Sequence, residues 1–176
     1  MERAYLGGGC FWCLDALYRR VRGVVEVTSG YGGGHVEGPS YEQVSGGASG
    51  HAEVVEIGFD PKVITYNKLL EIFWHIHDPT TPDRQGFDVG PQYRSIILFS
   101  DADQKKAAQQ SLKEVAQPLW GDRVVTELKP LQQFYPAEDY HQDYFNKNPQ
   151  AGYCQAIINP KLAKFQKEFA SLLKPV

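Results

Sequence analysis

The sequence predicts an α+β fold in which helices cover one face of a largely antiparallel sheet. Two observations predict it. Short segments with strand periodicity alternate with helical ones in the order strand, helix, strand, strand, helix, strand, which is the split βαβ arrangement. No internal repeat or low-complexity linker interrupts the 176 residues. A single domain over residues 1–176 is therefore expected, with helical and coil additions at the C-terminal end.

Apolar periodicity and turn residues place the expected elements in chain order. In the N-terminal half they are a strand at 3–6, a helix from 11 to about 22, a strand at 24–27, a polar loop over 28–50, a strand at 52–59 and a helix whose apolar face recurs at 69, 72, 73 and 76. The glycine-rich loop indicates irregular backbone close to a bound group. In the C-terminal half they are a strand at 93–99, a helix that Ser100 or Asp101 caps and that runs to about 117, a strand at 124–128, and two late helices that start at Pro136 and Pro160.

Composition and charge exclude several classes of protein. The chain is 42% hydrophobic and 22% charged, with a formal charge of −3, as is ordinary for a globular protein. It contains no run of about 18 apolar residues and no basic segment leading into an apolar one at its N-terminus. Lysine and arginine are spread thinly, so neither nucleic acid nor a membrane is an expected partner. We expect a cytoplasmic monomer.

The segment GGGCFWC, residues 7–13, carries the first chemical signal. Cys10 falls where the first helix begins, and unpaired backbone N–H groups with the positive end of the helix dipole favour a thiolate there. The glycines admit a ligand, and Phe11 and Trp12 supply apolar walls. Cys10 is therefore a candidate nucleophile, although a buried inert cysteine and ordinary core aromatics are the alternatives.

Cys13 lies one helical turn after Cys10, a spacing that suits a redox pair or two zinc ligands. Zinc needs two more ligands, and only Cys154 and scattered histidines remain, so no metal is expected. A thioredoxin-type oxidoreductase is the second hypothesis, weakened by the bulky residues between the cysteines. Three cysteines are too few and too unevenly placed for a disulfide framework.

The strand at 52–59 contains two glutamates on opposite faces. Glu53 shares a face with Val55 and Ile57, while Glu56 points the other way. A carboxyl group on an apolar face tends to stay protonated near neutral pH, so Glu53 is a candidate acid. A glutamate turned to solvent at the strand start is the alternative.

Further candidates have weaker support from their positions. Tyr41 in the glycine-rich loop, with Asp88 and Tyr93 in GFDVGPQYR, would complete a set of donors, but periodicity does not bring them together and half-buried packing is the usual role of a tyrosine. His141 reads as a structural histidine on a helix. Cys154 stands in a glycine-containing segment outside firm periodicity, which favours mobility.

Four segments together resemble the A-class peptide methionine sulfoxide reductases: GGGCFWC, SGYGGGHVEGPSYEQVSGGASGHAEVVEIGFDP, FWHIHDPTTPDRQGFDVGPQYRS and FYPAEDYHQDYF. Their joint occurrence in this order is far more specific than any one of them. The resemblance implies the family's two-layer α/β roll, with a mainly antiparallel mixed sheet around a βαββαβ ferredoxin-like core. It also implies a reductase that needs no cofactor.

The resemblance implies a role for each candidate. The nucleophile matches Cys10, the acid Glu53, the supporting hydroxyls Tyr41 and Tyr93, the carboxylate Asp88, and the apolar clamp Phe11 and Trp12. The implied reaction converts the S epimer of methionine sulfoxide, free or in peptides and proteins, to methionine and a Cys10 sulfenic acid. A second cysteine then forms a disulfide that thioredoxin reduces.

The resolving cysteine is where this chain departs from many relatives. Cys13 occupies a position that is often glycine, Ser45 stands where some members have cysteine, and no cysteine follows Cys154. The resemblance favours Cys154 as the first resolver, because members commonly use a C-terminal cysteine. Cys13 would act in a relay to a Cys13–Cys154 disulfide, would resolve Cys10 directly, or would be a passive helical residue.

Overall fold

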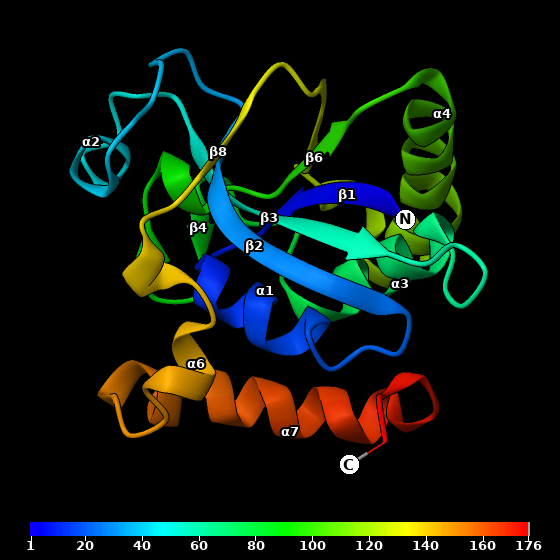
Figure 1. The fold of residues 1–176 in the computed structure, drawn as a ribbon. Coiled ribbons are helices and arrows are strands. Elements are labelled where there is room, and N and C mark those ends of the chain that lie inside the picture. Colours follow the sequence, from blue (N-terminus) through cyan, green and yellow to red (C-terminus); the bar gives the residue numbers. More distant parts are fainter. Residues whose placement is uncertain (176) are drawn as a thin grey trace.

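A six-stranded sheet with the order β7-β6-β1-β3-β2-β8 forms the centre of the molecule (Figure 1). The structure is a computed structural model and describes residues 1–175. The strands are β1 (Glu2–Gly7), β2 (Val24–Gly32), β3 (Ala52–Phe59), β6 (Ile96–Phe99), β7 (Glu127–Pro130) and β8 (Phe134–Pro136). Neighbouring strands are antiparallel except β6 and β7, which are parallel. A separate hairpin pairs β4 (Arg84–Gln85) with β5 (Asp88–Val89).

The predicted βαββαβ core is confirmed. The four strands β6-β1-β3-β2 lie side by side, with one helix between β1 and β2 and another between β3 and β6 along the chain. The helices are α1 (Phe11–Tyr18), α2 (Tyr41–Ser45), α3 (Tyr66–Ile76), α4 (Ala102–Ser111), α5 (Gln117–Trp120), α6 (Tyr144–Lys147) and α7 (Asn159–Glu168). The 3₁₀ turns are η1 (Pro91–Tyr93), η3 (Gly121–Arg123), η4 (Asp139–His141) and η6 (Ala170–Leu172), and the π-helical turns are η2 (Leu112–Ala116) and η5 (Cys154–Ile158).

The main hydrophobic core lies on the face of the sheet that α1 and α3 cover. Alternate residues of β3 point into it, including Val55 and Ile57, and α3 adds the fully buried Trp74. Helix α7 runs below α1 at the base of the molecule, so α1 lies between the sheet and α7 (Figure 1). On the opposite face of the sheet, Val54 belongs to a smaller apolar cluster that Phe134 partly covers.

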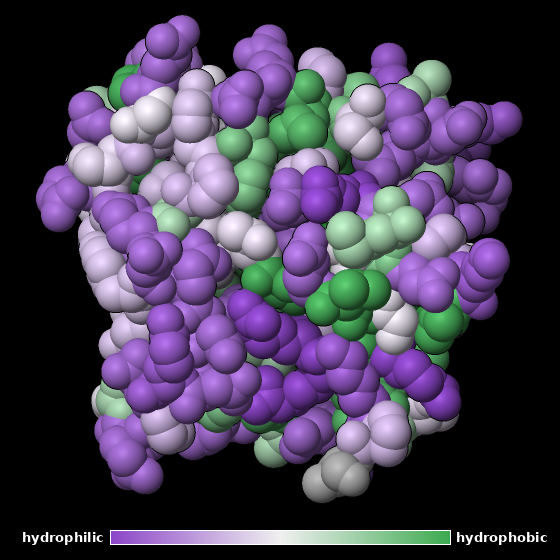
Figure 2. Space-filling model, in the orientation of Figure 1, coloured by the Kyte–Doolittle hydropathy of each residue, from purple (hydrophilic) through white to green (hydrophobic). Residues whose placement is uncertain are grey.

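The surface of the molecule in the view of Figure 2 is mostly hydrophilic, with apolar side chains in small separate patches. Across residues 1–175, no helix combines the length and the apolar character that crossing a bilayer requires.

Three local predictions are wrong. Strand β2 continues to Gly32 instead of ending at residue 27, because its later residues pair with both β3 and β8. Gly30 makes this possible, since a Cβ there would lie 2.4 Å from the Phe134 ring. The first glycines of the expected loop thus admit a neighbouring strand, not a ligand. Tyr93 lies in the turn η1, ahead of the strand predicted to contain it, and Pro136 ends β8 instead of starting a helix.

Candidate active site

Cys10 is the N-cap residue of α1 and lies in the turn that connects β1 to this helix. Gly9 makes this turn with a φ of 84°, which a residue with a side chain rarely adopts. The Gly9 amide donates a hydrogen bond to the Tyr93 carbonyl oxygen at 3.1 Å. The backbone before Cys10 is therefore tied to η1, and only 9% of the Cys10 surface is exposed. The prediction that Cys10 stands at a helix start is confirmed.

The expected preference of Cys10 for the thiolate is wrong in this state of the protein. Burial raises the pKa of the Cys10 thiol well above its ordinary value, and the nearby Glu53 and Cys13 raise it further. The Trp12 amide at the helix start lowers the pKa, as the prediction assumed, but the effect is smaller. Cys10 therefore rests as a thiol, and forming the thiolate requires a change in its surroundings.

Glu53 occupies the apolar side of β3, as strand alternation predicts. Its Oε1 accepts a hydrogen bond from the Phe11 amide at 3.0 Å, and only 1% of the residue is exposed. Burial raises the pKa of Glu53 to about 8, opposed by the Phe11 amide and by a hydrogen bond from the Cys10 thiol. At neutral pH Glu53 is thus a protonated acid next to Cys10.

Tyr41, Tyr93 and Asp88, which periodicity did not bring together, lie near Cys10 and Glu53. Burial raises the pKa of the Tyr93 hydroxyl, and the surrounding groups Glu53, Cys10, Tyr41 and Asp88 raise it further. Burial likewise raises the pKa of Tyr41, with added effects of Glu53, Cys10 and Asp88. Both phenols are therefore neutral hydrogen-bond donors at any physiological pH.

The two aromatics after Cys10 have different surroundings. Phe11 is buried, with its ring centroid 5.7 Å from that of Tyr31 and 5.1 Å from that of His141. Trp12 is partly exposed. Its indole stacks on Tyr144 at 3.6 Å with an interplanar angle of 5°, and its Nε1–H donates to His141 Nδ1 at 3.1 Å. The Trp12 ring is thus held on one face and one edge.

Glu138 is a residue that the sequence reasoning missed. Its Oε1 accepts from the Tyr31 hydroxyl at 2.9 Å, and its Oε2 accepts from the Tyr41 amide at 3.0 Å. Glu138 therefore ties α2, which carries Tyr41, to the sheet. Its only sequence signal was membership of the FYPAEDYHQDYF segment.

Tyr153 is the second missed residue; it contacts Cys13 and immediately precedes Cys154. Its hydroxyl donates to Asp88 Oδ2 at 2.6 Å and lies 3.7 Å from Cys13 Sγ, so the Cys13 thiol is the donor to Tyr153. The next residue, Cys154, begins the π-helical turn η5 and is completely buried. The expected mobility of Cys154 is therefore wrong for this state, and all three cysteines are free thiols.

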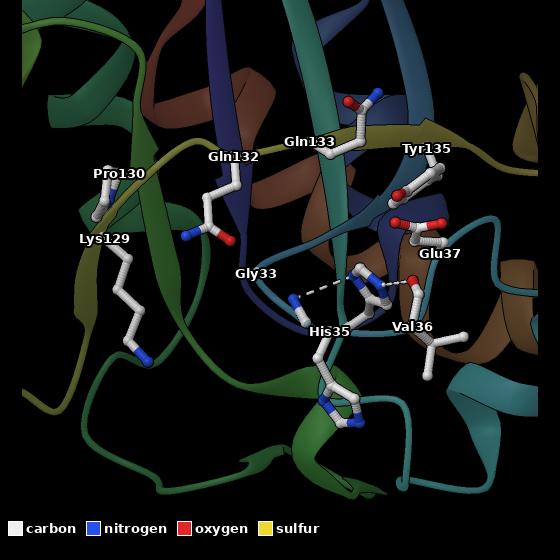
Figure 3. Close-up of a pocket in the computed structure, with 11 residues that line it drawn as sticks. Gly33, His35, Val36, Glu37, Lys129, Pro130, Gln132, Gln133 and Tyr135 are labelled. Atoms are coloured by element: carbon white, nitrogen blue, oxygen red, sulfur yellow. Dashed lines mark hydrogen bonds between the residues drawn. The ribbon is translucent and has the colours of Figure 1, made fainter.

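Two further features of the structure bear on a ligand. A polar cavity of about 580 Å³ beside β8 is lined by residues such as His35, Glu37 and Lys129 (Figure 3). His51 in its wall is fully paired, because Nδ1 accepts from the Gly34 amide at 3.1 Å and Nε2 donates to the Val36 carbonyl oxygen at 2.7 Å. None of the candidate catalytic residues lines this cavity. Among residues 1–175, no three His, Cys, Asp or Glu side chains come together as metal ligands would.

Comparisons with known proteins show the family of this chain. The family model described as peptide methionine sulfoxide reductase matches residues 2–173. The chain belongs to this family. It is 57% identical over 169 residues to the peptide methionine sulfoxide reductase MsrA of Sulfolobus acidocaldarius, covering 96% of each chain. It is 54% identical over 174 residues to MsrA of Saccharolobus solfataricus, covering 99% of this chain and 98% of that one.

Solved structures of a related protein, Mxr1 of Saccharomyces cerevisiae, relate the fold to redox state. The reduced form matches with a TM-score of 0.82 at 38% identity, over 87% of this chain and 88% of that one. An unusual oxidised form matches with 0.65 at 36% identity, over 85% and 82%. A complex of Mxr1 with Trx2 matches with 0.59 at 30% identity, over 81% and 84%. Of these three forms, the reductase structure described here resembles the reduced one most, in agreement with its three free thiols.

Proposed function

We propose that this chain reduces the S epimer of methionine sulfoxide, free or in peptides and proteins, to methionine, with Cys10 as the nucleophile. The observation that carries the proposal is the pairing of a thiol at a helix N-cap with a buried, protonated glutamic acid at the same point. A sulfoxide sulfur is electrophilic, but its oxygen leaves poorly unless a neighbouring donor protonates it or hydrogen-bonds to it, so the reaction uses both groups. Membership of the family supports the same chemistry.

The first step transfers the sulfoxide oxygen to the Cys10 sulfur. The Cys10 sulfur bonds to the sulfoxide sulfur while Glu53 gives its proton to the sulfoxide oxygen. The oxygen then passes to the Cys10 sulfur: the S–O bond of the substrate and the new S–S bond break, a bond forms between the Cys10 sulfur and the oxygen, and methionine leaves a Cys10 sulfenic acid behind. The hydrogen of the starting thiol restores the Glu53 proton, so one oxygen atom is transferred and the acid is recovered.

The remaining site residues act on the oxygen and on the methyl group. The neutral hydroxyls of Tyr41 and Tyr93 donate hydrogen bonds to the sulfoxide oxygen, where negative charge grows in the transition state. A donor bonded to that oxygen also reduces the electron density on sulfur. The methyl group of the substrate packs against Phe11 and Trp12. Because the indole ring is fixed, only one of the two sulfoxide epimers can then direct its oxygen toward Glu53.

A second thiol completes the cycle. Cys154 attacks the Cys10 sulfenic acid, a disulfide forms and water leaves. Cys13 then attacks the Cys154 sulfur of this disulfide, which breaks the Cys10–Cys154 bond and releases the Cys10 thiol. The resulting Cys13–Cys154 disulfide is reduced by the dithiol of a thioredoxin. The complex of the relative Mxr1 with Trx2 supports this reductant. The contact from Tyr153 to Cys13 supports the relay, because it places the residue before Cys154 against the Cys13 thiol.

The decisive experiment supplies the two epimers of N-acetyl-methionine sulfoxide separately, with dithiothreitol. The S epimer should be consumed and the R epimer left untouched. Equal turnover of both, or none of S, would disprove the proposal. Reduction of insulin disulfides by the protein, independent of any sulfoxide, would instead indicate a general disulfide oxidoreductase that uses Cys10 and Cys13.

A second experiment assigns the resolving cysteine. Without added reductant, Cys154→Ser should still convert about one methionine sulfoxide per enzyme but should lose cycling supported by thioredoxin. After one turnover, Cys13→Ser should retain no free thiol if Cys154 resolves Cys10, and one if it does not. In the parent, where any disulfide leaves one free thiol, mapping the disulfide-linked peptides identifies the pair. Normal cycling of Cys154→Ser would show that Cys13 resolves Cys10 directly.

The proposal includes one domain over residues 1–176 and a cytoplasmic location. A reducing compartment supports both the free thiols and a thioredoxin. Fractionation of cells, with an antibody against the protein and markers for each compartment, tests the location.

A further inference from the structure

The hairpin formed by β4 and β5 carries the most exposed of the large apolar side chains in residues 1–175. Phe87 at its tip is 94% exposed, and Val89 is 70% exposed. The tip turns at Gly86, whose φ of 59° suits a tight hairpin. The same hairpin carries Asp88, so the exposed ring stands directly beside a candidate site residue. An isolated exposed phenylalanine needs no explanation, but one at the rim of a reaction site does.

A groove of about 580 Å³ opens between this hairpin and the segment that holds Cys154. Its walls are mainly apolar, and it is lined by Gln85, Gly86, Phe87, Asp88, Gly152, Tyr153, Ala156, Ile157 and Lys161. Asp88 and Tyr153, joined by their 2.6 Å hydrogen bond, form the end of the groove nearest the reacting groups. The groove therefore ends at two residues that neighbour the reacting groups, since Tyr153 contacts Cys13 and the charge of Asp88 acts on Glu53.

We propose that this groove binds an apolar side chain next to the oxidised methionine of a polypeptide substrate, with Phe87 as the residue that selects it. The inference rests on the proposed function. In the proposed arrangement, a peptide whose sulfoxide reaches Cys10 extends in one direction past Asp88 and Tyr153 into this groove. An apolar side chain next to the sulfoxide buries its surface against Phe87 and Ile157. Free methionine sulfoxide has no neighbouring side chain and gains no such burial.

The state of the protein indicates substrate instead of the reductant as the occupant. One wall of the groove is made by Gly152, Tyr153, Ala156 and Ile157, which flank Cys154 while that cysteine is buried and reduced. This is the state that accepts a sulfoxide. When Cys154 reaches another sulfur, its segment has to shift and the wall shifts with it. The groove is therefore formed before oxygen transfer, not when thioredoxin arrives.

The test compares Phe87→Ala with the parent on three substrates: N-acetyl-methionine S-sulfoxide and two blocked peptides, in which the sulfoxide is flanked on both sides by leucine or by glycine. We expect the KM of the leucine peptide to rise about fivefold with kcat unchanged. The KM values of the other two substrates should stay as in the parent. Phe87→Leu, which keeps an apolar side chain, should restore most of the preference. Val63→Ala serves as a matched control, because Val63 is also exposed but does not line the groove.

Three outcomes would overturn the inference. A similar KM rise for all three substrates would mean that Phe87 acts through the catalytic site. A rise only in the KM for thioredoxin would assign the surface to the reductant, and a change in the sedimentation of the protein would assign it to self-association. Failure of the parent to reduce N-acetyl-methionine S-sulfoxide would disprove the proposed function itself, so the two failures are distinguishable.

Discussion

The raised pKa of Glu53 keeps the proposed acid protonated and also lowers the free energy of unfolding at neutral pH. The ordinary pKa of a glutamate is 4.5, whereas burial raises that of Glu53 to about 8. Between these values the unfolded chain releases the proton and the folded protein keeps it. Folding therefore binds a proton, and the contribution of this group to stability falls as pH rises from 4.5 to 8. Retaining the acid for catalysis thus makes the protein less stable at neutral pH.

Glu53→Gln should accordingly stabilise the protein at neutral pH. The amide keeps an oxygen that accepts from the Phe11 amide, and it has no proton to lose. The gain in the free energy of unfolding over the parent should grow by about 1.4 kcal/mol per pH unit, and reach about 3 kcal/mol at pH 7 as an upper value. Denaturant unfolding at pH 4.5, 6 and 7 measures it. A gain that does not change with pH would contradict the raised pKa.

Glu53→Ala and Glu53→Gln should differ in their single-turnover rates. Glu53→Ala should slow single-turnover reduction by about 100-fold or more, because no donor reaches the sulfoxide oxygen. Glu53→Gln should be slowed far less, since its amide still donates a hydrogen bond. In the parent, loss of the Glu53 proton should limit the rate above pH 8, and this limit should be absent in Glu53→Gln. Equal rates of the two variants in rapid-quench experiments would disprove the donor role.

The position of Tyr41 depends on a carboxylate that is distant in the sequence, that of Glu138. Helix α2 has only five residues, too few to fix its own place on the sheet, although Ser40 caps it by accepting from the Gln43 amide. Glu138 accepts from the Tyr41 amide, 97 residues away in the sequence, and from the buried Tyr31. The pKa of Glu138 is lowered by these hydrogen bonds, in spite of the opposing effect of burial. Its charged form is thus the one that holds α2.

Glu138→Ala should therefore act through Tyr41. We expect it to lower the single-turnover rate about tenfold, close to the effect of Tyr41→Phe, because both remove one hydrogen bond to the growing charge. Combining the two should cost little more than either alone, since they remove the same interaction. Glu42→Ala is the matched control, as Glu42 lies in the same helix and is exposed. Additive effects of Glu138→Ala and Tyr41→Phe would contradict a positioning role.

Strand and helix periodicity predicts some residues of the candidate site and misses others. Alternation along β3 correctly placed Glu53 on the apolar face, because a strand has only two faces. The N-cap position of Cys10 was also predicted, but its protonation was not, since burial of the thiol outweighs the local helix start. The contact of Tyr153 with Cys13 joins residues 140 apart, and the π-helical turn at Cys154 has no repeat of its own. Only the tertiary structure reveals these features.

In the proposed catalytic cycle Cys154 has to reach Cys10, although the structure buries its thiol. Cys10 lies at the junction of the sheet and α1, whereas Cys154 is completely buried at the start of η5, beside α7. A sulfur packed on all sides does not react with another until its segment moves, and a disulfide needs Cα atoms within about 7 Å. The hydroxyl of Tyr153, bonded to Asp88, helps to hold this segment. If Cys154 is the resolving cysteine, we expect formation of the disulfide to release this segment from the core.

Hydrogen exchange should detect this release. In the reduced protein the amides of residues 152–158 should be protected, because η5 and α7 pack on the core. After one turnover with methionine sulfoxide and no reductant, their exchange should become at least about tenfold faster, while the amides of β1 and β3 stay protected. The same treatment of Cys154→Ser should leave exchange of the segment slow, because its sulfenic acid has no partner there. Equal protection of residues 152–158 before and after turnover would contradict this release, and would mean that Cys154 reacts without leaving the core or that Cys13 resolves Cys10 directly.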